Sequence, residues 1–185
     1  MALTPSKMVP LGTIAPGFNL LDTVTEQWVS LNDVKSDKAT VIMFLCNHCP
    51  YVKHIRVELV NVANEYIKKG VSFVAISSND IDQYPEDSPE KMKEEAMTWN
   101  YPFPYLFDES QAIAKAYNAA CTPDFYIFDK NLELCYRGQF DNSRPGNTNE
   151  LTGKDMREAL DCLLSGNPVS EEQFPSAGCN IKWKD

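Results

Sequence analysis

The chain has 185 residues, of which 17 are basic and 26 acidic, so its formal net charge is −9 at pH 7. Hydrophobic residues make up 43% and charged residues 23%, which is ordinary for a folded protein and excludes a chain dominated by disorder. The acidic balance and the lack of a lysine or arginine cluster argue against nucleic acid and membrane surfaces as partners.

The length suits one domain, because domains commonly contain about 100–200 residues. We expect a single domain over residues 1–185, with an N-terminal extension over 1–38 and a C-terminal tail over 167–185. The N-terminal segment has no uninterrupted apolar stretch of the kind found in signal peptides, and no other stretch is apolar enough to span a bilayer. The sequence therefore favours a cytoplasmic protein.

The first predicted elements are short strands. Residues 17–34, "GFNLLDTVTEQWVSLNDV", contain two short apolar stretches separated by polar residues, as in a small hairpin. The apolar run 39–45, "ATVIMFL", contains β-branched residues and is short enough to be a strand covered on both faces. We expect this strand to lie at the centre of a sheet.

A strand, a helix and a second strand follow in order. After the cysteines at 46 and 49, apolar residues recur at steps of three, four and seven, and Gly70 supplies a stop, which predicts a helix from about residue 50. Residues 71–78, "VSFVAISS", are a second strand of the buried type. Two strands joined in this way are expected to be parallel, with a right-handed crossover.

The second half of the chain adds helices and an antiparallel hairpin. Ser88 and Pro89 are typical of an N-cap and a first helical residue, and we expect the acidic run from Asp80 to Glu95 to be a solvated face. The other expected elements are a short strand within 101–109, a helix within 110–119, a hairpin within 122–140 and a capped helix over 152–166. Together these elements predict an α/β domain.

The six cysteines are numerous for a cytosolic protein and too irregular for a secreted disulfide scaffold; they are Cys46, Cys49, Cys121, Cys135, Cys162 and Cys179. Two of them stand three positions apart in "FLCNHCPYVKH", where the central strand gives way to the helix. This spacing at a strand-to-helix junction favours redox chemistry over two small buried residues.

The position of the predicted helix assigns different roles to these two cysteines. Cys49 falls at the N-cap and Pro50 in the first turn, where a missing backbone N–H costs little. The unpaired amides and the positive end of the helix stabilise a thiolate, which is the reactive form of cysteine. Cys49 is therefore the candidate for attack on a sulfur or peroxide oxygen, and Cys46 is the candidate resolving thiol.

A second feature is the segment 120–129, "ACTPDFYIFD". A proline directly before a strand cannot donate to a ladder. If the Thr122–Pro123 bond is cis, it exposes the neighbouring backbone for pairing with an extended substrate.

On these residues the chain resembles the thioredoxin-like superfamily, specifically the redoxin group that includes alkyl hydroperoxide reductase/thiol-specific antioxidant proteins and thioredoxin-like thiol-disulfide oxidoreductases. The matching stretches are "GTIAPGFNLLD", "TVIMFL" leading into "CNHCP", "VSFVAISSND" and "TPDFYIFD" with the hairpin that follows, which span about residues 10–165. The resemblance implies a thioredoxin fold, with a central mixed β-sheet flanked by helices and preceded by the N-terminal β extension.

The resemblance also implies roles for individual residues. In thioredoxins an attacking cysteine at the helix start faces a cis-proline, and Cys49 and Pro123 match these positions, whereas Val52 stands where the usual resolving cysteine would be. In peroxiredoxins a Thr-x-x-Cys precedes the same helix and an arginine precedes the later strand. Cys49 again matches the attacking thiol, but Cys46 replaces the threonine and Thr122 stands near the position of the arginine.

The other cysteines have two interpretations each. Cys121 would lie beside the redox pair, as a third redox thiol or as a packed small residue. Cys179 belongs to a tail that is either packed or mobile, and a mobile tail would let it resolve an intermediate on Cys49. We expect Cys135 and Cys162 to be structural.

Two further groups of residues are candidates for the site. By the resemblance, the loop "FDNSRPGN" over 140–147 lies near the cysteines, where Arg144 could lower the pKa of Cys49 or bind a substrate carboxylate, unless it is an ordinary surface arginine. Thiolates and imidazoles also bind soft metals, so a copper or zinc carrier using Cys46, Cys49 and His48 is an alternative, loosely similar to copper-delivery proteins of this fold. Otherwise His48 is a solvated loop residue and His54 an exposed helix residue.

The sequence therefore predicts a thiol-disulfide oxidoreductase in which Cys49 attacks and Cys46 resolves. Its alternative is a peroxiredoxin-like thiol peroxidase with Cys49 as the peroxidatic cysteine, in which Cys46 or Cys179 captures the sulfenic acid. We expect a protein or small-molecule disulfide, or a peroxide, as substrate and a thioredoxin- or glutathione-type reductant. We expect no cofactor, because the chain has no glycine-rich phosphate cradle. The expected supporting residues are Pro50, Cys121, Thr122, Pro123 and Arg144.

Overall fold

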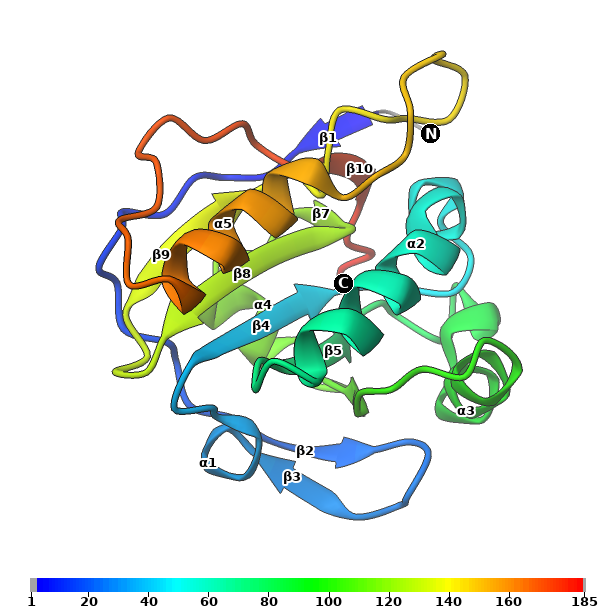
Figure 1. Cartoon of the computed structure of the whole chain (residues 1–185). Helices are drawn as coiled ribbons and strands as arrows, with labels where there is room; N and C mark the ends of the chain where they lie inside the picture. The colour runs from blue at the N-terminus through cyan, green and yellow to red at the C-terminus, as the bar shows by residue number, and fades with distance from the viewer. Residues whose placement is uncertain (1–2, 185) are drawn as a thin grey trace.

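The computed structural model describes residues 3–184. A seven-stranded mixed sheet runs through the molecule in the order β3-β2-β6-β5-β4-β8-β9, and a three-stranded sheet, β1-β10-β7, lies beside it (Figure 1). The strands are β1 Leu3–Pro5, β2 Asn19–Asp22, β3 Trp28–Ser30, β4 Ala39–Phe44, β5 Ser72–Ser77, β6 Tyr105–Phe107, β7 Cys121–Thr122, β8 Asp124–Asp129, β9 Leu134–Gly138 and β10 Ala177–Asn180. The helices are α1 Leu31–Val34, α2 Pro50–Ile67, α3 Pro89–Thr98, α4 Ala112–Ala116 and α5 Lys154–Leu164, with a 3₁₀ turn η1 at Pro85–Asp87.

Strand β4 lies at the centre of the large sheet, as its continuous apolar sequence predicted. It pairs in parallel with β5 and antiparallel with β8. Alternate side chains enter different hydrophobic clusters: Val41 and Met43 pack on one face, and Ile42 and Phe44 on the other. Because successive side chains of a strand point to opposite faces, burial of both faces requires the uninterrupted apolar run found here.

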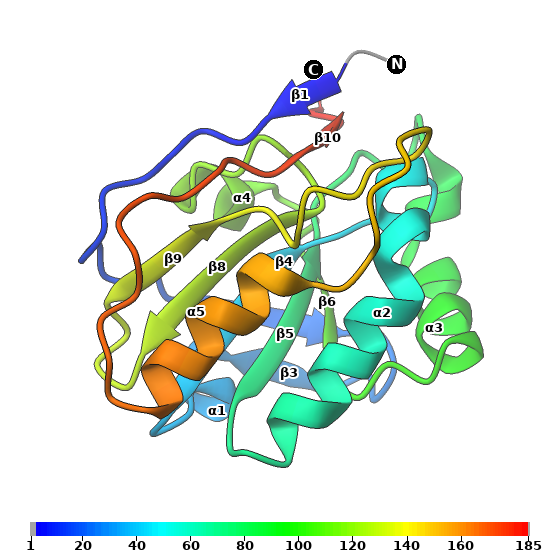
Figure 2. The same cartoon turned by 45° about the horizontal axis from the view of Figure 1, so that its top comes forward.

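The helices cover both faces of this sheet. Buried residues of α2, α3 and α5 pack in the first cluster, and those of α1 and α4 in the second. Figure 2 shows α2 and α5 lying side by side over the same face of the sheet. The structure confirms the predicted strand–helix–strand unit and the mixed α/β fold of the thioredoxin type.

The predicted N-terminal hairpin is formed by β2 and β3, which pair antiparallel. Strand β2 also pairs with β6, where Leu21 is opposite Phe107. The β extension is therefore continuous with the central sheet. On the other edge β8 and β9 form the predicted antiparallel hairpin.

The C-terminal tail contains a strand that the sequence did not predict. Strand β10 pairs with β1 on one side and with β7 on the other, where Cys179 is opposite Thr122. Cys179 is 1% exposed. Of the two interpretations of this tail, the structure supports the packed one.

The segment from Asp80 to Glu95 is only in part the solvated face that the sequence suggested, since Asp82, Glu86, Glu90 and Glu94 are exposed. Asp80 and Asp87 are buried, and η1 turns the chain so that Asp87 points inward. The predicted N-cap is correct, since the Ser88 hydroxyl accepts a hydrogen bond from the Lys91 amide. No helix among residues 3–184 is long and apolar enough to cross a membrane.

Candidate active site

Cys46 and Cys49 lie where the central strand meets helix α2. The helix begins at Pro50, and Cys49 is its N-cap residue with extended backbone dihedral angles, as predicted. Cys46 lies in the turn that follows β4. Both side chains are almost completely buried, with exposures of 1% for Cys46 and 0% for Cys49.

Three sulfur and oxygen atoms, from Thr122 and Cys179, lie against this pair. The Sγ atom of Cys49 lies 2.8 Å from the Sγ atom of Cys179 and 3.2 Å from the carbonyl oxygen of Thr122. The Sγ atom of Cys46 lies 3.2 Å from the hydroxyl oxygen of Thr122. Residues from β7, α2 and β10 thus meet at one point, although they are up to 130 positions apart in the chain.

The surroundings of Cys49 favour its thiolate. The pKa of Cys49 falls to about 5, and the largest cause is a hydrogen bond from the Cys46 thiol. Burial opposes this shift. A hydrogen bond from the Cys179 thiol and the backbone amides of Val52 and Cys179 lower the pKa further. The Thr122 carbonyl can accept a hydrogen bond only from the protonated thiol and therefore opposes ionisation. Several donors outweigh this one acceptor.

The neighbouring thiols are shifted in the opposite direction. Burial, the hydrogen bond to Cys49 and the charge of Asp87 raise the pKa of Cys46 well above its usual range. Burial and the hydrogen bond to Cys49 raise the pKa of Cys179 to about 12. Burial also raises the pKa of Cys121, which is fully buried with its Sγ atom 3.7 Å from the carbonyl oxygen of Pro123. The arrangement is one thiolate with two thiol donors.

Asp87 holds the loop between the two cysteines. Its Oδ1 atom accepts hydrogen bonds from the backbone amides of Asn47 and His48, at 2.8 and 3.2 Å. Its Oδ2 atom accepts from the side chain of Asn79 at 2.8 Å and lies 2.6 Å from Nδ1 of His48. No pattern in the sequence indicates this role of Asp87, because the role depends on how η1 folds back onto the loop.

The two histidines differ from their sequence interpretations. His48 is largely buried, with 11% of its side chain exposed, and stacks on Tyr84 with ring centroids 5.0 Å apart. His54 is half-buried, and its Nε2 atom lies 2.8 Å from the hydroxyl of Ser143. Neither is the exposed imidazole that the sequence suggested.

The candidate metal ligands are also a different set from the one expected. Within residues 3–184, the group whose ligand atoms lie within 4.8 Å of one another is Cys46, His48 and Asp87, without Cys49. Asp87 already has four hydrogen-bond contacts, two on each oxygen. The absence of Cys49 from this group argues against a metal held by Cys46, Cys49 and His48, and the occupied oxygens of Asp87 argue against a metal held by the group itself.

The other predicted residues take up supporting positions. The Thr122–Pro123 peptide is cis. The guanidinium of Arg144 donates to its own loop, at the carbonyl oxygens of Asp141 and Ser143, and to the side chain of Gln139. This loop and Pro123 line a small depression of about 10 Å³. Arg144 therefore lies near the site, but its hydrogen bonds stabilise the loop.

An unpredicted ion pair lies directly behind β7. Arg137 and Asp124 are completely buried and paired, and the guanidinium also stacks 3.8 Å from the centre of the Tyr126 ring. Asp124 accepts a further contact from the Ala120 amide. A charged pair across neighbouring strands cannot be identified from single residues, because the hairpin register decides which side chains meet.

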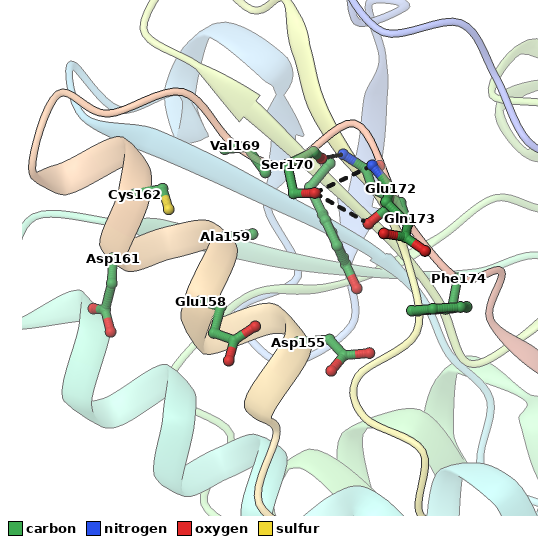
Figure 3. A pocket seen from close by; sticks show the side chains of 11 residues that line it. Asp155, Glu158, Ala159, Asp161, Cys162, Val169, Ser170, Glu172, Gln173 and Phe174 are labelled. Atoms are coloured by element: carbon green, nitrogen blue, oxygen red, sulfur yellow. Dashed lines mark hydrogen bonds between the residues drawn. The ribbon is translucent and has the colours of Figure 1, made fainter.

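The largest groove near a remaining cysteine lies away from this site. It has a volume of about 450 Å³ and lies between α5 and the segment 169–174, with Cys162 on its wall. Figure 3 shows the acidic side chains of α5 at this groove, namely Asp155, Glu158 and Asp161. Among the described residues, no second cysteine lines it.

Comparison with known proteins places the chain in a family. The model of the AhpC/TSA family matches residues 11–137. No curated protein matches the sequence. Among solved structures, an uncharacterized conserved protein from Geobacillus kaustophilus is 62% identical, with a TM-score of 0.98 over 100% of this chain and 97% of that one.

Two other structures extend the comparison. A hypothetical protein from Sinorhizobium meliloti 1021 is 45% identical, with a TM-score of 0.95 over 98% of both chains. The thioredoxin domain of a thiol-disulfide oxidoreductase from Bacteroides vulgatus is 16% identical, with a TM-score of 0.63 over 83% of this chain and 99% of that one. The last similarity concerns the fold alone.

Proposed function

The chain belongs to the AhpC/TSA family of redoxins, and from this premise we propose that it is a thiol-disulfide oxidoreductase in which Cys49 attacks a substrate disulfide and Cys46 resolves the intermediate. One observation carries this proposal: Cys49, whose pKa is lowered, contacts Cys46 and Cys179, whose pKa values are raised. A thiolate beside a protonated thiol is the arrangement that thiol-disulfide exchange requires.

The reaction proceeds in two exchanges. The Cys49 thiolate attacks one sulfur of the substrate disulfide, forms a mixed disulfide and releases the other sulfur as a thiolate, which takes up a proton. Cys46 then loses its proton and attacks the Cys49 sulfur, which releases the second substrate thiol and leaves a Cys46–Cys49 disulfide. One substrate disulfide is reduced to two thiols, and the protein dithiol is oxidised in the same two-electron step.

Two parts of the site prepare these steps. The start of helix α2 supplies amides and the positive end of a dipole beside Cys49. The charge of Asp87 raises the pKa of Cys46 and so helps to keep it protonated until the Cys49 thiolate has formed the mixed disulfide. Once Cys49 is in a mixed disulfide, it can no longer accept the hydrogen bond that keeps the proton on Cys46.

The test is to trap the mixed disulfide. We expect the Cys46→Ser variant to accumulate a covalent adduct with a small disulfide, found by intact mass and mapped to Cys49, while the wild-type protein passes on to an internal disulfide. The Cys49→Ser variant should form no adduct at this rate, and Cys162→Ser, on the distant groove, should behave as wild type. An adduct that forms equally well in Cys49→Ser would overturn the proposal.

The peroxidase alternative has less support at this site. Among the described residues, the hydrogen-bond partners of Cys49 are cysteines and backbone groups, with no arginine side chain to hold a peroxide. Treating the same variants with hydrogen peroxide separates the two activities. Faster oxidation of Cys49 by peroxide than by disulfide would favour the peroxidase.

The oxidised protein needs an electron donor for the next cycle. A thioredoxin- or glutathione-type thiol supplies two electrons by the same exchange chemistry, and the cytoplasm maintains such donors in reduced form. We therefore place the activity in the cytoplasm, with protein or small-molecule disulfides as substrates. Incubation of the oxidised protein with each donor, followed by thiol counting, identifies the one that restores the dithiol.

A further inference from the structure

Strand β10 occupies the backbone edge next to the attacking cysteine. It pairs antiparallel with β7, with Cys179 opposite Thr122 and Asn180 opposite Cys121. The pairing continues beyond the strand, since the Ile181 amide donates to the carbonyl oxygen of Ala120 and the Ser176 hydroxyl donates to that of Pro123. Figure 2 shows β10 lying between β1 and the rest of the molecule.

The same strand places a sulfur atom against Cys49. The two Sγ atoms are 2.8 Å apart, close to the distance of reacting atoms in a near-attack arrangement. Cys179 therefore stands where the sulfur of an incoming disulfide would have to stand. The chain's own tail has the backbone pairing and the cysteine of a docked peptide.

The fit between β10 and β7 is closest at Gly178. A Cβ atom added at this residue would lie 2.0 Å from the carbonyl oxygen of Thr122 and 3.1 Å from Cδ of Pro123. Both neighbours belong to the site rather than to a flexible surface side chain. Only a glycine immediately before the cysteine allows the strand to approach this closely.

With β10 in place, the site is closed to other sulfur atoms. Cys46, Cys49, Cys121 and Cys179 are each at most 1% exposed. The depression beside Pro123 has a volume of only about 10 Å³, roughly the space of one water molecule. Neither a peptide nor a small disulfide has a route to Cys49 in this arrangement.

We propose that β10 is an internal occupant of the substrate-binding edge: residues 177–180 hold the place of an extended cysteine-bearing segment along Cys121–Thr122, and Cys49 exchanges with protein disulfides only after β10 leaves this edge. The segment that replaces β10 carries a glycine directly before its cysteine. This inference rests on the proposed oxidoreductase function and adds to it a closed resting state and a substrate preference.

The exchange is balanced in the same way as before. After β10 has left, the Cys49 thiolate attacks the incoming cysteine of the substrate disulfide, and the sulfur to which that cysteine was bonded leaves as a thiolate and is protonated by solvent. Resolution by Cys46 then releases the substrate cysteine as a thiol. When β10 returns, it displaces the reduced segment from β7.

The release of β10 can be favoured by a substitution that is remote from the sulfur atoms. After β10 the tail is held by Gln111, whose side chain donates to the carbonyl oxygen of Lys182 at 2.8 Å and accepts from the Lys184 amide at 2.9 Å. The Gln111→Ala variant removes both contacts but leaves the cysteines intact. The Gly178→Val variant instead disrupts the contact with Thr122 directly.

The experiment uses two synthetic peptides as probes. One has the tail sequence Pro-Ser-Ala-Gly-Cys-Asn-Ile-Lys with its cysteine in a disulfide with 2-thiopyridine, and the other has valine in place of glycine. Release of thiopyridone is followed for the full-length wild type, Gly178→Val, Gln111→Ala and the control Gly17→Ala, whose added Cβ meets no atom within 4 Å. Each rate is divided by the thiolate fraction of Cys49 at the same pH, read from its thiolate absorbance, so that differences in ionisation cancel but differences in access to the sulfur do not.

We expect the normalised rate with the glycine peptide to rise about tenfold in Gly178→Val, a change of about 1.4 kcal/mol in the opening equilibrium. It should rise less in Gln111→Ala and stay at the wild-type value in Gly17→Ala. The valine peptide should react more slowly than the glycine peptide with every variant. If Gly178→Val does not fold, Gln111→Ala carries the test.

Two outcomes overturn different statements. Equal normalised rates for the wild type and the tail variants, with hydrogen exchange showing that residues 177–181 have lost protection, would overturn the internal-occupant proposal and leave the oxidoreductase function standing. Failure of the opened variants to react with either peptide or with a small disulfide would overturn the proposed function itself. Equal rates of the two peptides would overturn the glycine preference.

Discussion

The junction of β7, β10 and α2 differs sharply from the groove beside α5, although each contains cysteine and carboxylate side chains. At the junction, Cys49 meets two other thiols, and all of them are buried. At the groove, Cys162 lies among exposed carboxylates of one helix and its facing segment. Cysteine alone therefore does not define a reactive site; donors from several elements must converge on one sulfur.

The same contrast holds for the ion pairs of the two regions. Behind β7, the side chains of Arg137 and Asp124 are both completely buried. On α5, Lys154 and Glu158 are paired at 3.6 Å, and about two-thirds of each side chain is exposed. A buried charge that loses its partner has no water to replace it. Substitutions at the buried junction should therefore change stability and thiol reactivity more than substitutions at the exposed groove.

The largest expected effect is on folding stability. We expect Arg137→Met to lower the free energy of unfolding by about 3–5 kcal/mol, because the Asp124 carboxylate is left buried and uncompensated. Lys154→Met, at the exposed pair, should change it by no more than about 0.5 kcal/mol. Urea unfolding of both variants measures the difference, and similar values for the two would remove the contrast between the regions.

The second expected effect is on thiol reactivity. With a pKa of about 5, Cys49 is almost fully ionised at pH 7, whereas a cysteine at the usual value of 9.0 is ionised to about 1%, a difference of roughly 100-fold in thiolate. The pH profile of Cys49 ionisation, read from its thiolate absorbance in a variant lacking the other cysteines except Cys46 and Cys179, should have its midpoint near 5.

Cys135, titrated in a second variant that keeps it as the single cysteine, is the control for this measurement. Burial and the charge of Asp129 raise its pKa above 9.0. Its midpoint should therefore lie above that of an ordinary thiol, on the opposite side from Cys49. Midpoints on the same side would contradict the assignment of the thiolate to the junction.

A smaller effect concerns the loop between the cysteines. We expect Asp87→Asn to cost about 1–3 kcal/mol of stability, since the loop amides lose a charged acceptor. The pKa of Asp87 is lowered below 3.8, despite burial, by His48 and then Asn79. Its contribution is therefore complete above pH 3.8 and is lost as the pH falls through the lower folded value.

The pH dependence of unfolding checks this sign. The wild type should lose stability below pH 3.8 relative to Asp87→Asn, so that the difference between the two proteins narrows in acid. The charge of Asp87 also raises the pKa of Cys46, so the variant should titrate Cys46 at lower pH. A difference that widens in acid would contradict the role of Asp87 as a charged acceptor.

The smallest expected effect is that of Thr122→Val. This change removes the hydroxyl 3.2 Å from Cys46 and retains the backbone carbonyl beside Cys49. We expect a loss of about 0.5–1.5 kcal/mol in stability, the usual value of one hydrogen bond. The midpoint of Cys49 should stay near 5, and Thr98→Val, on the exposed end of α3, should leave stability unchanged.

The sequence predicted the parts of this site that depend on neighbouring residues. The strand β4, the N-cap position of Cys49 and the first-turn position of Pro50 follow from apolar periodicity and helix-end preferences. The resemblance to redoxins pointed to the Thr122–Pro123 segment, which the structure places beside both cysteines.

The parts that sequence reasoning missed depend on distant pairings. In the sequence, Asp87 is one of several acidic residues in a charged loop. Only the fold of η1 brings it to the amides of Asn47 and His48. Likewise, the tail around Cys179 has no clear strand pattern, and its position is set by pairing with β1 and β7. A short strand with few residues depends on its partners rather than on its own propensity.

The position of β10 in the chain has a consequence for how the protein is made. Cys49 leaves the ribosome 130 residues before Cys179, which at about 5–20 residues per second corresponds to roughly 6–26 s. Strands β4 and β5 and helix α2 are all available during that interval, so Cys46 and Cys49 can come together before their cover exists. In a nascent chain Cys49 is therefore exposed to oxidation and to foreign cysteines without any opening step, whereas in the finished molecule the same exposure requires β10 to leave its edge.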